Sequence, residues 1–164
     1  MSKWIYLAGP LFTAAELNFN QHIASQLRHN GYQIYLPQQQ CAGVTDPVRL
    51  FDICVKGLQG ASLVLVLLDG PDADSGSCFE VGYAYAKGLP IVGVRTDFRG
   101  SGEYMGINLM LASSCTRLLV TRNPAHAHTP PPSGVTYMNM GDDVIPYILD
   151  VLSALAAAQA ARIG

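Results

Sequence analysis

Charged residues are scarce in this sequence, and neither sign of charge dominates. Only 13% of the 164 residues are charged, and the formal net charge is −2. Because no basic excess is available to attract a polyanion, the composition argues against a nucleic acid polymer as a partner. Hydrophobic residues make up 49% of the chain. We therefore expect a single domain over residues 1–164 with a sizeable core, and a partner subunit covering some of its uncharged surface.

Long apolar runs and paired cysteines are also missing. No run approaches the roughly 20 residues needed to span a bilayer, and Met1–Trp4 enters a strand pattern without a signal-peptide layout. We expect a cytoplasmic protein with no membrane partner. The absence of a CxxC pair favours reduced, buried thiols over a disulfide framework or a zinc site. The cysteines are Cys41, Cys54, Cys78 and Cys115.

Signatures for common cofactors are absent too. The chain has neither a P-loop nor a GxGxxG after its first strand pattern. His126 and His128 stand in a proline-rich loop without a matching acid or thiol, which predicts a surface feature rather than a metal site. We expect no metal and no cofactor.

Strand and helix patterns alternate along the chain. This alternation predicts an α/β fold, a three-layer sandwich whose five-stranded parallel sheet carries helices on both faces. The order 2-1-3-4-5 would place a topological switch point between the first and third strands. The expected strands are 4–8, 32–36, 62–68, 90–95 and 116–120. The expected helices are 13–29, 47–58, 75–87, a short piece near 107–113, and one from Asp142 or Asp143 onward.

Local signals fix some of these boundaries. Thr13 followed by Glu16 is a capping box for the first long helix. In the last helix, Ile148 and Leu152 lie on one stripe and predict a core or interface face, while Pro146 is tolerable only in the first turn. Residues 123–135 contain several prolines and are expected to form a loop.

The most informative stretch is 74–84. It follows an apolar run, Leu63–Leu68, typical of a strand buried on both faces, and an acidic turn, Asp69–Asp74. Ligands bind at this edge of open α/β sheets. Glu80, on the next helix, can act there as a nucleophile or a base, or it can be an ordinary solvated helix residue.

The helix pattern predicts how Glu80 projects. Cys78, Val81 and Tyr85 share a face that suits packing on the sheet. Glu80 projects elsewhere, and the small residues Gly76 and Ser77 are expected to leave open space one turn before it.

Other polar residues occupy positions that allow two interpretations. Tyr6, three residues before Gly9, either packs in the core or donates a hydrogen bond to Glu80. Asp52 is an unexpected acid after an apolar pair. The aspartates around Asp74 are turn formers or acids, and crowding would raise the pKa of one carboxyl and suit it to general acid catalysis.

Several segments together resemble the nucleoside 2-deoxyribosyltransferases: Ile5–Phe12, then Asp74 and Glu80 with Gly82–Ala84, then Asn108–Met110. The resemblance covers about two-thirds of the chain. It implies a flavodoxin-like fold and a homo-oligomer, with a dimer unit that commonly assembles into hexamers. It also implies exchange of purine or pyrimidine nucleobases on 2′-deoxyribonucleosides, with retention at the anomeric carbon, no cofactor and weak hydrolase side activity.

The resemblance also implies roles for individual residues. Glu80 corresponds to the nucleophile that attacks C1′ and forms a deoxyribosyl ester, and Tyr6 to the phenol that orients it. Asp74 and Asp52 correspond to acids of the base pocket, one of which protonates the departing base. Gly9 lies at the substrate crevice.

Further positions are implied to bind substrate. Gln40 corresponds to a base-contacting glutamine, although the spacing allows Gln39 or Gln38 instead. Asn108 would bind the sugar 5′-hydroxyl and Met110 would pack by the nucleophile, both from a neighbouring subunit. Residues 95–99 and the tail after 121 have no implied role.

Three alternatives remain open at this stage. A 2′-deoxynucleoside 5′-phosphate N-hydrolase belongs to the same superfamily, but an aspartate at position 74 would repel a phosphate dianion. A plain nucleoside hydrolase would differ only in using water to attack the intermediate. A non-catalytic module that senses nucleosides or nucleotides could bind ligand in the same crevice.

Overall fold

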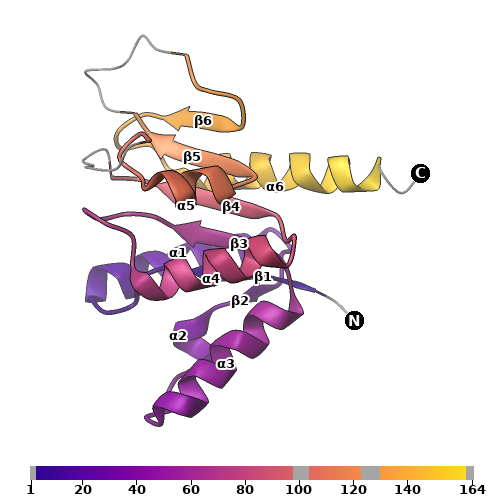
Figure 1. Cartoon of the computed structure of the whole chain (residues 1–164). Helices are drawn as coiled ribbons and strands as arrows, with labels where there is room; N and C mark the ends of the chain where they lie inside the picture. Colours follow the sequence, from indigo (N-terminus) through magenta and orange to yellow (C-terminus); the bar gives the residue numbers. More distant parts are fainter. Residues whose placement is uncertain (1–2, 98–103, 123–129, 162–164) are drawn as a thin grey trace.

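A six-stranded parallel sheet forms the centre of the molecule (Figure 1). The computed structural model describes residues 3–97, 104–122 and 130–161. The strand order is β2-β1-β3-β4-β5-β6, and each neighbouring pair is parallel. The strands are β1 (Trp4–Ala8), β2 (Ile34–Tyr35), β3 (Ala61–Leu67), β4 (Ile91–Arg95), β5 (Arg117–Thr121) and β6 (Val135–Met138).

The predicted order 2-1-3-4-5 is confirmed, and one strand is added to it. β6 pairs with β5, with Leu118 opposite Val135 and Thr121 opposite Met138. The loop expected over residues 123–135 overlaps this strand at Val135, and its residues 123–129 lie outside the described part of the chain. The strand itself was not predicted. It is a four-residue edge strand in which only Met138 is buried, so its sequence lacks the apolar run of the central strands. His126 and His128 lie outside the described residues.

Helices cover both faces of the sheet, as predicted for a three-layer sandwich. On one face α1 and α6 pack against the side chains of Ile5, Leu7 and their neighbours. On the other face α3, α4 and α5 pack against the alternate side chains, which include Tyr6 and Ala8 (Figure 1). The helices are α1 (Ala14–His29), α2 (Pro37–Gln40), α3 (Pro47–Gly60), α4 (Ser75–Ala86), α5 (Leu109–Ser114) and α6 (Val144–Ala160).

Helix ends follow the local signals in the sequence. The capping box is present, with the Glu16 amide donating to Thr13 Oγ1 at 3.2 Å and the Thr13 amide donating to Glu16 Oε2 at 2.7 Å. Pro146 lies in the first turn of α6, where its missing N–H costs little. Ile148 and Leu152 are buried in the core, which confirms the core reading of that stripe. Within the described ranges, no helix combines the length and hydrophobicity needed to cross a membrane.

Candidate active site

Tyr6 and Glu80 meet although 74 positions separate them in the sequence. Tyr6 lies on β1 with its ring fully buried, and its hydroxyl donates a hydrogen bond of 2.5 Å to Glu80 Oε1. Both interpretations of Tyr6 therefore hold, because the ring packs in the core while the hydroxyl reaches the carboxylate. The contact fixes the direction of a half-buried carboxylate on α4.

Burial makes the Glu80 carboxylate titrate near neutrality. Loss of hydration raises the pKa of Glu80 to about 7, the hydrogen bond from Tyr6 opposes this rise, and the nearby Asp74 charge adds to it. Burial and the Glu80 charge together raise the pKa of Tyr6 far above its ordinary value. Tyr6 therefore remains a hydrogen-bond donor while Glu80 gains or loses its proton.

The face that α4 turns to the sheet differs from the prediction. Ser77, Val81 and Ala84 are buried, whereas Tyr85 is 67% exposed and Cys78 only half-buried. Val81 was placed correctly, but its partners on that face are the small residues one position earlier than those predicted. Small side chains at 77 and 84 let the helix approach the sheet closely, and the larger Tyr85 is left at the surface. The prediction that Ser77 leaves open space is therefore wrong.

Asp74 caps α4 and lies near the hydrogen-bonded pair of Tyr6 and Glu80. Its Oδ2 accepts hydrogen bonds from the Ser77 amide at 2.8 Å and from the Ser77 hydroxyl at 3.1 Å. Its charge also acts on Glu80. The structure thus brings Asp74, Glu80 and Tyr6 together at the carboxyl ends of β1 and β3.

Gly9 lies at the same edge, directly after β1. A Cβ atom at Gly9 would come within 3.2 Å of Leu67 Cβ at the end of β3. A side chain there would crowd the two strand ends, so glycine keeps this part of the edge open.

Asp52 lies on α3 and is exposed. Its neighbour Phe51 approaches Phe79 of α4, with ring centroids 6.0 Å apart. These two rings bring α3 and α4 together one residue before Asp52, but Asp74 is the acid whose charge raises the pKa of Glu80.

The three candidate glutamines of α2 point to different places. Gln38 accepts a hydrogen bond from Asn20 at 3.2 Å, and Asn20 also donates to the carbonyl of Pro10 at 2.9 Å. Gln39 contacts α1, accepting from Arg28 at 2.9 Å. Gln38 is therefore the glutamine beside the loop that follows Gly9.

Gln40, the first choice from the sequence, lies elsewhere. It lines a depression of about 350 Å³ together with Trp4, Gln33 and Tyr35. Trp4 begins β1, so this depression extends toward the amino ends of the strands. The structure does not bring Gln40 to the Tyr6 and Glu80 pair.

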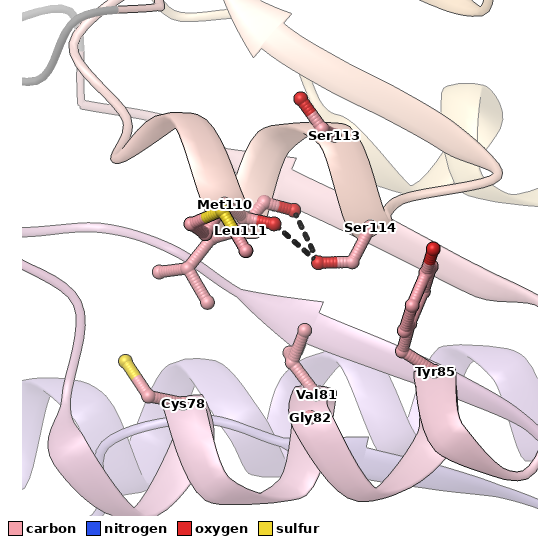
Figure 2. A pocket seen from close by; sticks show the side chains of 8 residues that line it. All are labelled: Cys78, Val81, Gly82, Tyr85, Met110, Leu111, Ser113 and Ser114. Carbon is pink, nitrogen blue, oxygen red and sulfur yellow. Dashed lines mark hydrogen bonds between the residues drawn. The ribbon is translucent and has the colours of Figure 1, made fainter.

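Asn108 and Met110 begin α5 at the surface. Asn108 is the N-cap, accepting from the Met110 amide at 2.9 Å, and the Met110 side chain is 76% exposed. Figure 2 shows Met110 above a groove between α4 and α5 with a volume of about 280 Å³. The lining residues are Cys78, Val81, Gly82, Tyr85, Met110, Leu111, Ser113 and Ser114. Glu80 is not among the residues that line this groove.

A set of hydrogen bonds from Arg95 and Thr96 beneath the acidic turn, called the brace below, was not predicted from the sequence. The buried Arg95, at the end of β4, donates to the carbonyl of Leu68 and, at 2.9 Å, to that of Gly70. Asp69 accepts from the Thr96 amide at 2.6 Å and the Thr96 hydroxyl at 2.5 Å. The turn that leads to α4 is thus tied to the next strand. An arginine ending an apolar strand was the available signal.

A stack of aromatic rings behind Tyr6 was also missed. Tyr35 lies between Trp4 and Tyr6, with centroid separations of 5.5 Å to each. Its hydroxyl donates to the Ile53 carbonyl of α3 at 2.7 Å. A Cβ atom at Gly57 would lie 2.3 Å from the Tyr35 ring, so α3 needs glycine there to admit the stack. The described residues contain no group of three or more His, Cys, Asp or Glu side chains placed to hold a metal ion.

Together, the fold and these contacts define a flavodoxin-like α/β protein with a hydrogen-bonded carboxylate at the ligand-binding edge of its sheet. The sequence profile of the nucleoside 2-deoxyribosyltransferase family matches residues 5–114, and the chain belongs to this family. That range includes each of the candidate site residues from Tyr6 to Met110. Family membership supports a glycosyl-transfer enzyme that acts on N-glycosidic bonds.

Solved structures share the fold. A conserved protein from Enterococcus faecalis V583 is 28% identical, with a TM-score of 0.61 over 75% of this chain and 92% of that one. A 2-deoxyribosyltransferase from Bacillus psychrosaccharolyticus is 22% identical, with a TM-score of 0.59 over 70% of this chain and 83% of that one. A CMP N-glycosidase from Clostridium botulinum is 15% identical, with a TM-score of 0.56 over 91% of this chain and 99% of that one. No curated protein sequence matches the chain significantly.

Proposed function

We propose that the protein exchanges the nucleobase of 2′-deoxyribonucleosides through a covalent deoxyribosyl ester on Glu80. The observation that carries this proposal is the hydrogen bond of 2.5 Å from the buried Tyr6 hydroxyl to Glu80 Oε1. It holds a desolvated carboxylate at the edge where ligands of such sheets bind. The family match provides the substrate class.

In the first half-reaction the ionised Glu80 carboxylate attacks C1′ of the donor. Tyr6 occupies Oε1, so Oε2 is the oxygen that forms the new bond. The bond from C1′ to the base nitrogen breaks, and its electron pair leaves with the base. The negative carboxylate stabilises the positive charge that develops on the sugar.

The departing base needs a proton because it leaves poorly as an anion. Asp74 and Asp52 are the two candidate donors, and Asp74 is the one whose charge acts on Glu80. In the second half-reaction an acceptor base attacks C1′ and releases Glu80. Two displacements give retention at C1′ and ping-pong kinetics.

The proposed site is completed by a second copy of the chain. Asn108 and Met110 are exposed near each other at the start of α5. A neighbour that brings these residues over the sugar would also exclude water, which favours an acceptor base over hydrolysis.

Base exchange tests the proposal directly. Deoxyadenosine and cytosine should yield adenine and deoxycytidine, and mass spectrometry of protein trapped with donor alone should find a deoxyribosyl adduct on Glu80. Glu80→Gln should abolish both products, while Glu16→Gln, which changes an exposed carboxylate in a cap, should retain them. Binding of deoxyadenosine without turnover by both parent and Glu80→Ala would instead identify a sensing module and refute the proposal.

A 5′-phosphate N-hydrolase is the second candidate, because the CMP N-glycosidase likeness extends over 91% of this chain. Charge at the site opposes it. Asp74 flanks Glu80, and the nearby Arg95 is engaged with the carbonyls of Leu68 and Gly70. A phosphate dianion would meet carboxylates there. Free deoxyribose phosphate as the main product from deoxyadenosine monophosphate would favour this candidate over base exchange.

A further inference from the structure

Two cysteine side chains meet beside the proposed nucleophile. The Sγ atoms of Cys41 and Cys54 are 4.0 Å apart. Cys41 is the C-cap of α2, and Cys54 lies in the middle of α3. Both side chains are half-buried, so neither is sealed from solvent. The helices α2 and α3 contact each other and lie side by side in Figure 1.

The pair differs from the other two thiols. Cys78 Sγ donates to the Ala73 carbonyl at 3.8 Å, and Cys115 Sγ donates to the Leu111 carbonyl at 3.3 Å. Each of these therefore contacts backbone, whereas Cys41 and Cys54 contact each other. A disulfide requires the sulfurs to approach to about 2.05 Å. The 4.0 Å between the two Sγ atoms must therefore shorten by about 2 Å before the disulfide forms.

Cys54 also contacts the machinery proposed for the reaction. Burial raises the pKa of Cys54 to about 11, the nearby Cys41 adds to this rise, and hydrogen bonding with Tyr6 opposes it. Cys54 thus interacts both with Cys41 and with the Tyr6 hydroxyl. A shift of the Cys54 sulfur therefore affects Glu80 through Tyr6.

We propose that Cys41 and Cys54 form a reversible thiol-oxidation site that takes a small disulfide as oxidant and, in its oxidised form, loosens the hydrogen bond between Tyr6 and Glu80. The second part of this inference rests on the proposed function of Glu80. In a reducing compartment such a pair would be oxidised transiently, as regulatory cytosolic disulfides are.

The chemistry balances with the oxidant named. The Cys41 thiolate attacks one sulfur of oxidised glutathione, and one glutathione leaves as a thiolate. The Cys54 thiolate then attacks the Cys41 sulfur of the mixed disulfide and releases the second glutathione. The two thiol protons end on the two reduced glutathione molecules. Because the half-buried Cys54 thiol has its pKa raised to about 11, it is rarely ionised and its attack is the slower step.

Oxidation acts on Tyr6 through Cys54. The disulfide removes the thiol hydrogen of Cys54 and draws its sulfur toward Cys41. A hydroxyl that loses such a partner donates less strongly to its own acceptor. The expected result is a roughly two- to fivefold lower kcat/KM for base exchange, the size of one weak hydrogen bond.

The test uses the full chain equilibrated in buffers of fixed reduced and oxidised glutathione ratio. Peptide mapping after alkylation should find a Cys41–Cys54 disulfide, and exchange activity should fall as it forms and return with reductant. Cys41→Ser should keep the reduced activity and lose the oxidative effect. Cys78→Ser, the matched control, should keep both. Cys41→Ala repeats the measurement if the serine variant folds poorly.

Two outcomes would overturn the inference. One is accumulation of glutathione adducts without a Cys41–Cys54 disulfide at any ratio. The other is formation of the disulfide with unchanged exchange activity. If the reduced parent shows no exchange, the proposed function fails, but the mapping still decides the oxidation site. Carbon-13 titration of the Glu80 carboxyl then decides the coupling, because oxidation should raise its pKa and an unchanged titration would refute it.

Discussion

The Tyr6 hydroxyl donates to Glu80 Oε1 across 2.5 Å, joining the central strand β1 to the helix that follows β3. Because Tyr6 lies on a central strand and Glu80 on a helix, regular elements rather than a loop carry both side chains. A rigid base of this kind suits a carboxylate that must be aimed at one carbon atom.

The rate of base exchange should depend on the ionisation of Glu80. Burial raises the pKa of this carboxyl to about 7. Only the ionised form attacks C1′, so kcat/KM should fall about tenfold for each pH unit below that value. A pH profile of base exchange between deoxyadenosine and cytosine measures this acidic limb, the fall of kcat/KM at low pH. A rate that stays constant from pH 7 to pH 5 would contradict the assignment of Glu80.

Removing the Tyr6 hydroxyl should move that limb to higher pH. The hydrogen bond from Tyr6 lowers the pKa of Glu80, so Tyr6→Phe should raise it and should reduce kcat/KM by about 10- to 100-fold at pH 7. Tyr85→Phe is the matched control, because Tyr85 lies on the same helix as Glu80 and is 67% exposed. The same profile measured for both variants separates an electrostatic effect from a loss of packing.

Folding stability should respond to the same carboxyl. Its pKa in the folded protein lies above the ordinary value of 4.5, so the folded state binds more protons between pH 4.5 and about 7. Stability is therefore greatest below pH 4.5 for this group and is lost as pH rises through 7. Glu80→Gln should raise the free energy of unfolding at pH 8 by up to about 3 kcal/mol. Urea denaturation at pH 5 and pH 8 measures the difference, and an equal effect at both values would refute it.

The brace beneath the acidic turn should contribute to stability. Asp69 accepts hydrogen bonds from Thr96 and from the Asp97 amide at 3.0 Å, so Asp69→Ala should cost about 1–3 kcal/mol. The exposed Asp72 accepts a local bond from the next amide, and Asp72→Ala should cost less than about 0.5 kcal/mol. Thermal unfolding of the two variants tests this difference. Equal losses of stability in both variants would contradict the prediction.

Met110 should matter for assembly rather than for folding. Its side chain is 76% exposed at the start of α5, so Met110→Glu should leave the monomer stable while weakening association. Specific activity should then fall at low protein concentration. Met140→Glu, at a methionine that is 63% exposed in another turn, should have neither effect. Sedimentation and activity over a dilution series measure both. Unchanged activity in a demonstrated monomer would exclude the shared site.

The architecture could be predicted from the sequence because a strong local signal marked each central element. The apolar run at 63–68 has the length and composition of a buried strand, and Thr13 with Glu16 marked a helix start. The edge strand β6 was missed because a short, half-exposed strand has no comparable signal. Hydrophobic periodicity placed Val81 correctly on α4 but favoured Tyr85 over Ala84, since spacing does not show that small residues permit the closer approach.

The candidate site was only partly readable. Tyr6 and Glu80 come together because β1 pairs with β3 and α4, which Asp74 caps, follows β3. The glutamine that lies beside the crevice depends on how a four-residue helix turns, and this separated Gln38 from Gln40 only in three dimensions. Tyr35 and Arg95 were missed because their contacts link residues far apart in the sequence.

Efforts to engineer the donor range of this protein would do well to leave Gly57 and Gly60 unaltered. Their missing side chains give room to Tyr35 and Trp4, the rings stacked behind Tyr6. Even an alanine at either position, ordinarily a mild and helix-favouring replacement, would wedge α3 outward and tilt the phenol that aims the carboxylate. Two glycines far from Glu80 in the sequence thus limit how the residues behind Tyr6 can be changed.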